Sequence, residues 1–312
     1  TPLDNSPEGV AGVLPIMMNR LEAVMNLCKK YSLKAELTLF CCAVNGERTV
    51  PSYLENRNIF TDPTALMWEQ RFIKYIVERF KDHVALGGYC IGNEYSSVKN
   101  INGNVAAQYS WTAIVCNAIR AIDQDHPIIS GLSFLTTESV NPENSAFWQL
   151  HYHAESVDML TVHPNKIFRF GDKANTMRAI ISTAAVNNML ENIGNKKCFV
   201  EDASVNSYKS GSITENVKGS LLSCYLHGCY GYFFGSDFKE DSSIKEMQKT
   251  ITALSKIDIP RHSSHAVCVM PINLRKTQYL ATNVMCLMAQ NDIGVSYCCA
   301  TSELPESKLY MV

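Results

Sequence analysis

The chain has 312 residues, of which 46% are hydrophobic and 19% are charged, so it carries enough apolar material for a large folded core. The 28 basic and 30 acidic residues give a formal net charge of −2, which favours neither a nucleic-acid partner nor an anionic-membrane partner. No apolar run reaches the length that a membrane span needs, and the first ten residues resemble neither a signal peptide nor a transit peptide. We therefore expect no nucleic acid and no membrane among the partners.

Twelve cysteines are distributed along the sequence, mostly inside apolar runs, and none of them forms a C-x-x-C motif. Cysteines in such positions act as small hydrophobic residues. We interpret them as reduced thiols rather than as a disulfide framework or a zinc site. Reduced thiols predict a cytoplasmic location.

Strands alternate with helices through the first 240 residues. The helices are recognised by apolar residues at helical spacing, and an Asp-Pro pair at 62–63 marks one helix start. The strands are nearly continuous in apolar residues, which is typical of parallel strands buried on both faces. The predicted order is helix 15–30, strand 33–44, helix 62–83, strand 84–92, helix 104–122, strand 126–133, helix 144–154, strand 157–164, helix 172–192, strand 197–204, helix 212–227 and strand 228–236.

A second β-α-β series begins after residue 240. It comprises helix 241–257, strand 266–270, helix 276–293 and strands 294–299 and 308–312. Such a series predicts the start of a small doubly wound, flavodoxin-like α/β domain.

The predicted strands of the first series end in residues that carry chemistry. In a (β/α)₈ barrel, functional groups lie at the C-terminal ends of the strands. Two carboxylic acids that face one pocket suit glycosidic bond cleavage, because one donates a proton and the other meets the anomeric carbon. The residues at these strand ends are Asn93 and Glu94, then His163, then Glu201 and Asp202, then Phe233 or Phe234.

Three segments carry a family resemblance. "YCIGNEYS" resembles the strand-4 motif of clan A glycoside hydrolases, especially the cellulase- and mannanase-like family 5, "KKCFVEDAS" resembles their strand-7 motif, and "VDMLTVHP" resembles their sixth strand. The resemblance implies a (β/α)₈ TIM-type barrel and a retaining β-glycosidase. It implies that Glu94 is the acid/base, that Glu201 is the nucleophile, and that Asn93 and His163 bind substrate.

The sequence also departs from the family pattern. Asn165 stands where the family usually has Tyr, and Phe233 and Phe234 stand where the last strand usually ends in Trp. By resemblance, the first two strands and the first helix are not in this sequence, so we expect a chain truncated at both ends. Residues 1–240 would form an incomplete barrel, and residues 241–312 resemble the first part of the amidotransferase-like domain that follows the barrel in family 42 β-galactosidases.

Other assignments stay open at this point. Phe234 and Trp148 are predicted to bind substrate, although Trp148 also fits a core position. Asp202 competes with Glu201 for the pocket, because adjacent strand residues face opposite sides. His163 also suits a structural histidine, and Glu94 a surface acid. The remaining tryptophans, at 68 and 111, are predicted to lie in the core.

No metal and no cofactor are predicted. The "HYH" motif at 151–153 lies in a helix-like pattern, where residues two apart diverge. The expected partner is an oligosaccharide or glycoside, with the sugar unspecified. Homo-oligomer formation is left open, since the trailing domain mediates association in some relatives. The alternatives are a non-catalytic carbohydrate-binding barrel and a metal-dependent amidohydrolase-like barrel.

Overall fold

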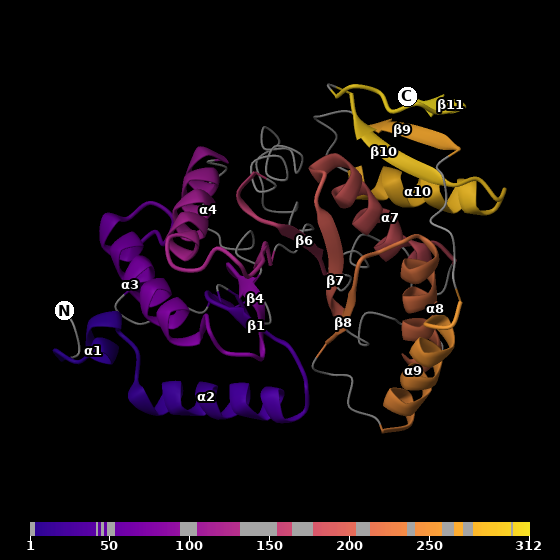
Figure 1. Ribbon diagram of the computed structural model, residues 1–312. Helices are drawn as coiled ribbons and strands as arrows, with labels where there is room; N and C mark the ends of the chain where they lie inside the picture. The colour runs from indigo at the N-terminus through magenta and orange to yellow at the C-terminus, as the bar shows by residue number, and fades with distance from the viewer. Residues whose placement is uncertain are drawn as a thin grey trace. The chain divides into compact units, whose positions relative to one another are not determined.

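The computed structural model describes residues 4–41, 43–44, 47–48, 54–93, 105–131, 155–163, 177–203, 213–235, 241–257, 265–270, 277–300 and 302–312 (Figure 1). The chain forms two compact units. The first comprises Thr1–Gly131 with Glu155–Met159, and the second comprises Leu132–Ala154 with Leu160–Val312. Within the described ranges, no helix has both the length and the apolar character that a membrane span requires.

The first unit contains helices and strands in alternation, as the sequence predicted. Its elements are α1 (Pro7–Ala11), α2 (Pro15–Lys30), β1 (Ala35–Thr38), β2 (Ala43–Val44), β3 (Glu47–Arg48), α3 (Pro63–Phe80), β4 (Leu86–Cys90), α4 (Val105–Arg120) and β5 (Ile128–Ile129). The predicted strand 33–44 is in fact two strands, since β1 ends at Thr38 and β2 pairs antiparallel with β3 in a hairpin. Neither that hairpin nor the five-residue helix α1 was predicted.

Local chemistry fixes where α3 begins. Asp62 is its N-cap, and the carboxylate accepts hydrogen bonds from the backbone N–H groups of Thr64 at 2.8 Å and Ala65 at 3.1 Å. Pro63 follows at the first helical position. Proline suits this position because a backbone N–H there would have no hydrogen-bond partner within the helix. The Asp-Pro signal in the sequence therefore predicted this boundary to within one residue.

Helices α1 and α2 attach to α3 through polar contacts. The Tyr75 hydroxyl donates to Glu8 Oε1 at 2.6 Å, and the Arg79 guanidinium donates to Glu22 Oε2 at 2.7 Å. Few residues of α2 are buried: Met18 and Met25 pack inward. Several large apolar side chains of the same helix are exposed, namely Ile16, Met17, Val24 and Leu27.

The described part of the second unit begins inside β6 and contains the remaining elements. They are β6 (Met159–Val162, of which Met159 belongs to the first unit), α7 (Met177–Gly194), β7 (Lys197–Ala203), α8 (Ile213–Leu226), β8 (Tyr232–Phe234), α9 (Asp241–Leu254), β9 (Ala266–Met270), α10 (Thr277–Ala289), β10 (Val295–Cys299) and β11 (Leu309–Met311). The predicted helix 144–154 lies outside the described residues.

The strands of the first series form one six-stranded sheet in the order β1-β4-β5-β6-β7-β8. The pairs β1–β4, β4–β5, β5–β6 and β7–β8 are parallel. Strands that are consecutive in this series are therefore neighbours, and helices connect them, which is the strand order of a (β/α) barrel. This order confirms the predicted fold class for the described residues.

The trailing elements form a separate three-stranded parallel sheet in the order β10-β9-β11. The first strand in the sequence, β9, therefore lies between the second, β10, and the third, β11. A flavodoxin-like sheet begins with the same strand order. Helix α7 contacts α10 and β10 as well as β7, and Asn192 Oδ1 accepts a hydrogen bond from the Tyr297 backbone N–H at 2.9 Å. A domain boundary at residue 240 stays a prediction.

Candidate functional site

A buried histidine and an accessible carboxylate meet at the ends of β6 and β7. His163 directly follows β6, and Glu201 lies near the end of β7. The distance between His163 Nε2 and Glu201 Oε2 is 3.1 Å, which is hydrogen-bonding range. The His163 side chain is 1% exposed and the Glu201 side chain is 18% exposed. The imidazole is therefore enclosed, whereas the carboxylate keeps a surface that a ligand can reach.

The alternation of β7 determines which face Glu201 occupies. Cys198 and Val200 are fully buried at 0% exposure, and burial raises the pKa of the Cys198 thiol well above its ordinary value, so the thiol stays neutral. Phe199 and Glu201 point to the other face, because successive strand residues alternate. Strand β7 is thus anchored by one apolar face and presents its carboxylate on the opposite one.

Strand β8 places its two phenylalanines on opposite faces. Tyr232 and Phe234 pack against the buried pair Leu221 and Met247, which belong to α8 and α9. Phe233 points the other way and contacts Phe199 of β7, with ring centroids 5.0 Å apart and ring planes tilted by 50°.

The register connects β8 to the carboxylate of β7. Val200 is aligned with Tyr232 and Ala203 with Phe234, so the register shifts between these two pairs. The ring contact with Phe199 places Phe233 on the face of β7 that Phe199 and Glu201 share. Phe233 is also 51% exposed. Phe233 is therefore an aromatic side chain near Glu201, and the substrate contact of Phe234 stays a prediction.

The end of β4 lies in the first unit and carries Asn93. Its backbone N–H donates to the Phe40 carbonyl at 2.8 Å, directly after β1 and β4 end. Glycines shape this turn: Gly131 has a φ of +64°, and a Cβ there would lie 2.0 Å from the Gly92 carbonyl oxygen. Asn93 is thus held by backbone contacts at a strand end, as the barrel interpretation requires.

Two predicted site residues, Glu94 and Trp148, and the "HYH" motif lie outside the described residues. Of the six predicted site residues, the structure brings His163 and Glu201 into contact. It also places Glu36 of β1 near a strand-end thiol, with less than 4.8 Å between the Glu36 carboxylate and Cys90 Sγ. The sequence reasoning missed Glu36, although a charged residue inside the apolar run "LKAELTLF" is a signal for it.

Another buried carboxyl lies between α3 and α4. Glu69 is 6% exposed, and the indole N–H of Trp111 donates to its Oε2 at 2.9 Å. Burial raises the pKa of Glu69 to about 8, against the smaller opposing effect of that hydrogen bond. Trp111 at 0% and Trp68 at 7% exposure confirm the prediction that both indoles belong to the core.

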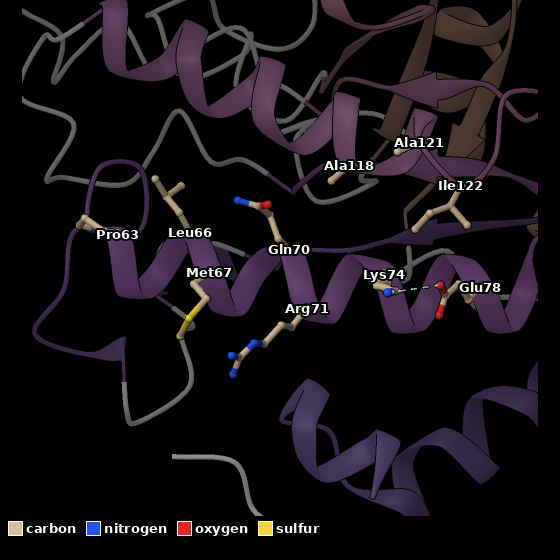
Figure 2. A pocket seen from close by; sticks show the side chains of 10 residues that line it. All are labelled: Pro63, Leu66, Met67, Gln70, Arg71, Lys74, Glu78, Ala118, Ala121 and Ile122. Atoms are coloured by element: carbon tan, nitrogen blue, oxygen red, sulfur yellow. Dashed lines mark ion pairs between the residues drawn. The ribbon is translucent and has the colours of Figure 1, made fainter. Parts of the chain in front are cut away.

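The outer surface of the first unit has a groove of about 810 Å³ between α3 and α4. Figure 2 shows its lining and the ion pair between Lys74 and Glu78, whose charged atoms are 3.9 Å apart. The lining residues are Pro63, Leu66, Met67, Gln70, Arg71, Lys74, Glu78, Ala118, Ala121 and Ile122. None of them is a predicted site residue, so the groove is separate from the strand ends.

Comparisons with solved structures agree with this architecture. GH5_18 from Streptomyces cattleya in complex with GlcNAc matches with a TM-score of 0.74 and 10% identity, over 92% of this chain and 80% of that chain. A GH5_18 variant from Bifidobacterium longum subsp. longum in complex with Manb1-4GlcNAc matches with a TM-score of 0.71 and 11% identity, over 95% and 78%.

The exo-beta-1,4-mannosidase Op5Man5 from an Opitutaceae bacterium matches with a TM-score of 0.72 and 15% identity, over 97% of this chain and 62% of that chain. No protein-family model and no curated protein matches the sequence. At these identities the likeness shows the fold alone, and that fold is the one found in family 5 glycoside hydrolases.

Proposed function

We propose that this chain is a glycoside hydrolase that cleaves β-linked glycosides, with Glu201 as its nucleophile. The proposal is carried by the contact between the buried His163 and the accessible Glu201 at the ends of adjacent parallel strands. Functional groups of (β/α) barrels lie at this end of the strands. The fold shared with family 5 enzymes and the exposed Phe233 on the face of Glu201 add support.

The proposed reaction proceeds in two steps with net retention. In the first, a Glu201 oxygen attacks the anomeric carbon while Glu94 gives its proton to the leaving glycosidic oxygen, so that the C–O bond breaks and a glycosyl ester forms. In the second, Glu94 removes a proton from water, the water oxygen attacks the same carbon, and the ester bond breaks to release the Glu201 carboxylate. Asn93 and Phe233 would contact the sugar.

We propose a β-mannoside as the substrate class. The supporting observation is that structural neighbours are named as a mannosidase and as a GH5_18 enzyme bound to Manb1-4GlcNAc. An aromatic ring such as Phe233 suits the apolar face of a pyranose.

The test is hydrolysis of aryl β-mannosides, β-galactosides and β-glucosides by the wild type, Glu201→Gln and Glu94→Gln. Loss of either carboxylate should lower kcat/KM roughly 10³-fold or more, because each group acts on the reacting atoms. Glu306→Gln, an exposed acid outside the site, is the matched control and should behave as wild type. Equal rates for all four proteins, with sugar still bound, would favour the non-catalytic alternative. The anomer of the first product, followed by proton NMR, tests retention.

A further inference from the structure

Helix α2 has an exposed apolar stripe beside the face that it buries. Met18 and Met25 pack into the first unit, and Met25 is fully buried. At 3.6 residues per turn, six other positions of the helix and its C-cap share an arc of about 100° next to that buried face. Five of them hold large apolar side chains that are 48–64% exposed, and the sixth holds an exposed arginine. These residues form the α2 stripe: Ile16, Met17, Arg20, Val24, Leu27 and Tyr31.

The attachment of α2 within the first unit leaves this stripe open. Glu22 accepts a hydrogen bond from the Arg79 guanidinium at 2.7 Å, and it lies on the side of the helix nearly opposite the stripe. The buried Met18 and Met25 lie between Glu22 and the stripe around the helix. The ion pair and the buried methionines therefore hold α2 with the stripe turned outward.

The stripe provides the apolar area that one side of a stable dimer needs. Half-exposed side chains of this size each leave on the order of 100 Å² accessible, so the five apolar residues present roughly 500 Å². A standard interface buries about 800 Å² per partner, of which roughly 60% is apolar. That fraction is again about 500 Å², so the stripe supplies the apolar part of such an interface by itself.

The spacing of the stripe suits packing against another helix. Its members alternate in steps of three and four residues, as in the seam of a helix pair, at Met17, Arg20, Val24, Leu27 and Tyr31. Val24 stands at the centre of this series. A two-fold axis beside Val24 therefore brings the stripe onto its own copy, with Met17 opposite Tyr31 of the partner subunit.

The charges of α2 favour an antiparallel pair of such helices. Lys29 and Lys30 lie in the last turn, so a parallel pair would bring the lysines of both copies together. In an antiparallel pair centred on Val24, the two copies of Lys30 lie roughly 18 Å apart along the helix axis. This distance exceeds the Debye length of about 8 Å at physiological salt, so their repulsion is screened.

The one charge of the stripe does not require a charged partner. Arg20 lies along Met17, with Nη1 3.8 Å from the Met17 sulfur. A long arginine side chain in this position covers apolar surface with its stem and keeps its guanidinium at the rim. An otherwise apolar stripe is matched by a second copy of itself, whereas a strongly acidic or basic partner would leave its own charges without counterparts.

We propose that the α2 stripe is the interface of a homodimer, in which the α2 helices of two copies pack antiparallel about a two-fold axis near Val24. The interface belongs to the first unit and not to the trailing elements. It does not depend on the proposed glycosidase activity, because the stripe contains none of the residues assigned to the reaction.

Sedimentation velocity of the full chain at about 1–100 μM tests the proposal. The wild type should reach twice the 34.8 kDa mass of one chain within this range. Val24→Glu should raise the dissociation constant at least about 100-fold, because it buries two like charges at the centre of the interface. Ile251→Glu is the matched control, since Ile251 is a β-branched residue on helix α9 with 46% exposure, and this variant should dimerise like the wild type. Circular dichroism checks that each variant is folded.

Mixing experiments test which residues face each other. Val24→Glu mixed with Val24→Lys should restore the dimer, because opposite charges then meet at the axis. Met17→Glu mixed with Tyr31→Lys should restore it as well, since only an antiparallel pair brings these two positions together.

Three results would overturn the proposal. A wild type that stays monomeric up to about 100 μM would exclude the dimer, and a folded Val24→Glu variant that dimerises as tightly as the wild type would place the contact on another surface. Recovery in the Val24 mixture without recovery in the mixture of Met17→Glu and Tyr31→Lys would exclude the antiparallel arrangement.

Discussion

The buried carboxyl of Glu69 should make the stability of the first unit fall as pH rises. Its pKa is about 8 in the folded protein and 4.5 when freely solvated, with burial as the cause. Below about pH 4.5 both states hold the proton, so Glu69 contributes no difference. Between about 4.5 and 8 the unfolded chain releases the proton and the folded chain keeps it, so each pH unit removes about 1.4 kcal/mol of unfolding free energy. Over the whole window the loss is on the order of 5 kcal/mol.

Glu69→Gln tests this reasoning, because glutamine keeps an acceptor for the Trp111 indole and cannot ionise. Urea unfolding followed by tryptophan fluorescence at pH 5.5, 6.5 and 7.5 gives the free energy for both proteins. The variant should gain roughly 2–3 kcal/mol relative to wild type between the first and last pH.

Glu78→Gln on the same helix is the control, since that side chain is 53% exposed and should show no such gain. If the unfolding free energies of the wild type and of Glu69→Gln changed with pH by the same amount, Glu69 would be ionised in the folded protein. The argument from burial would then be wrong.

Three further substitutions follow from the packing of the second unit. Phe233→Ala should raise KM with little change in melting temperature, while Phe234→Ala should lower the melting temperature because its ring packs on the core of α8 and α9. Steady-state kinetics and thermal unfolding of both variants test this. The reasoning would be wrong if Phe233→Ala lowered the melting temperature and Phe234→Ala raised KM alone. Asn192→Ala should cost about 1–3 kcal/mol, since it leaves the Tyr297 N–H without its acceptor between α7 and β10; an unchanged unfolding midpoint in urea would refute it.

The strands and helices were predictable where the sequence pattern was long and uniform. Helix α2 spans the predicted residues 15–30, and β9 spans the predicted 266–270. The predictions were too long where the apolar run continues past the paired residues: of the described residues of "HPIISGLS", 126–131, the strand comprises Ile128–Ile129. An apolar run indicates which residues are buried. The strand itself ends where the neighbouring strand no longer provides hydrogen-bond partners, and that neighbouring strand cannot be identified from a short stretch of sequence.

The sequence predicted that His163 and Glu201 lie at one edge of the sheet, and the structure places them in contact, while the roles of the predicted site residues stay predictions. Parallel strands end on one edge, which is why Glu201 and His163 could be paired from the sequence alone. Whether Phe233 or Phe234 accompanies them depends on a register that the sequence does not carry. In the structure the Phe233 ring contacts Phe199 of β7, whereas Phe234 packs on the core of α8 and α9, and the substrate contact of either ring stays a prediction.

The carboxyl groups of Glu69 and Glu201 each lie within hydrogen-bonding distance of a ring nitrogen of a buried side chain. Their surroundings nevertheless indicate different roles for the two residues. Glu69 meets the Trp111 indole at 2.9 Å and is enclosed on all sides, so it stays protonated at neutral pH and serves packing. Glu201 meets the His163 imidazole at 3.1 Å and remains partly open. The hydrogen-bond partner is therefore a poor guide to function. Access to a ligand is the better guide, because a nucleophile has to approach the atom that it attacks, and of these two side chains Glu201 has the open face that this approach requires.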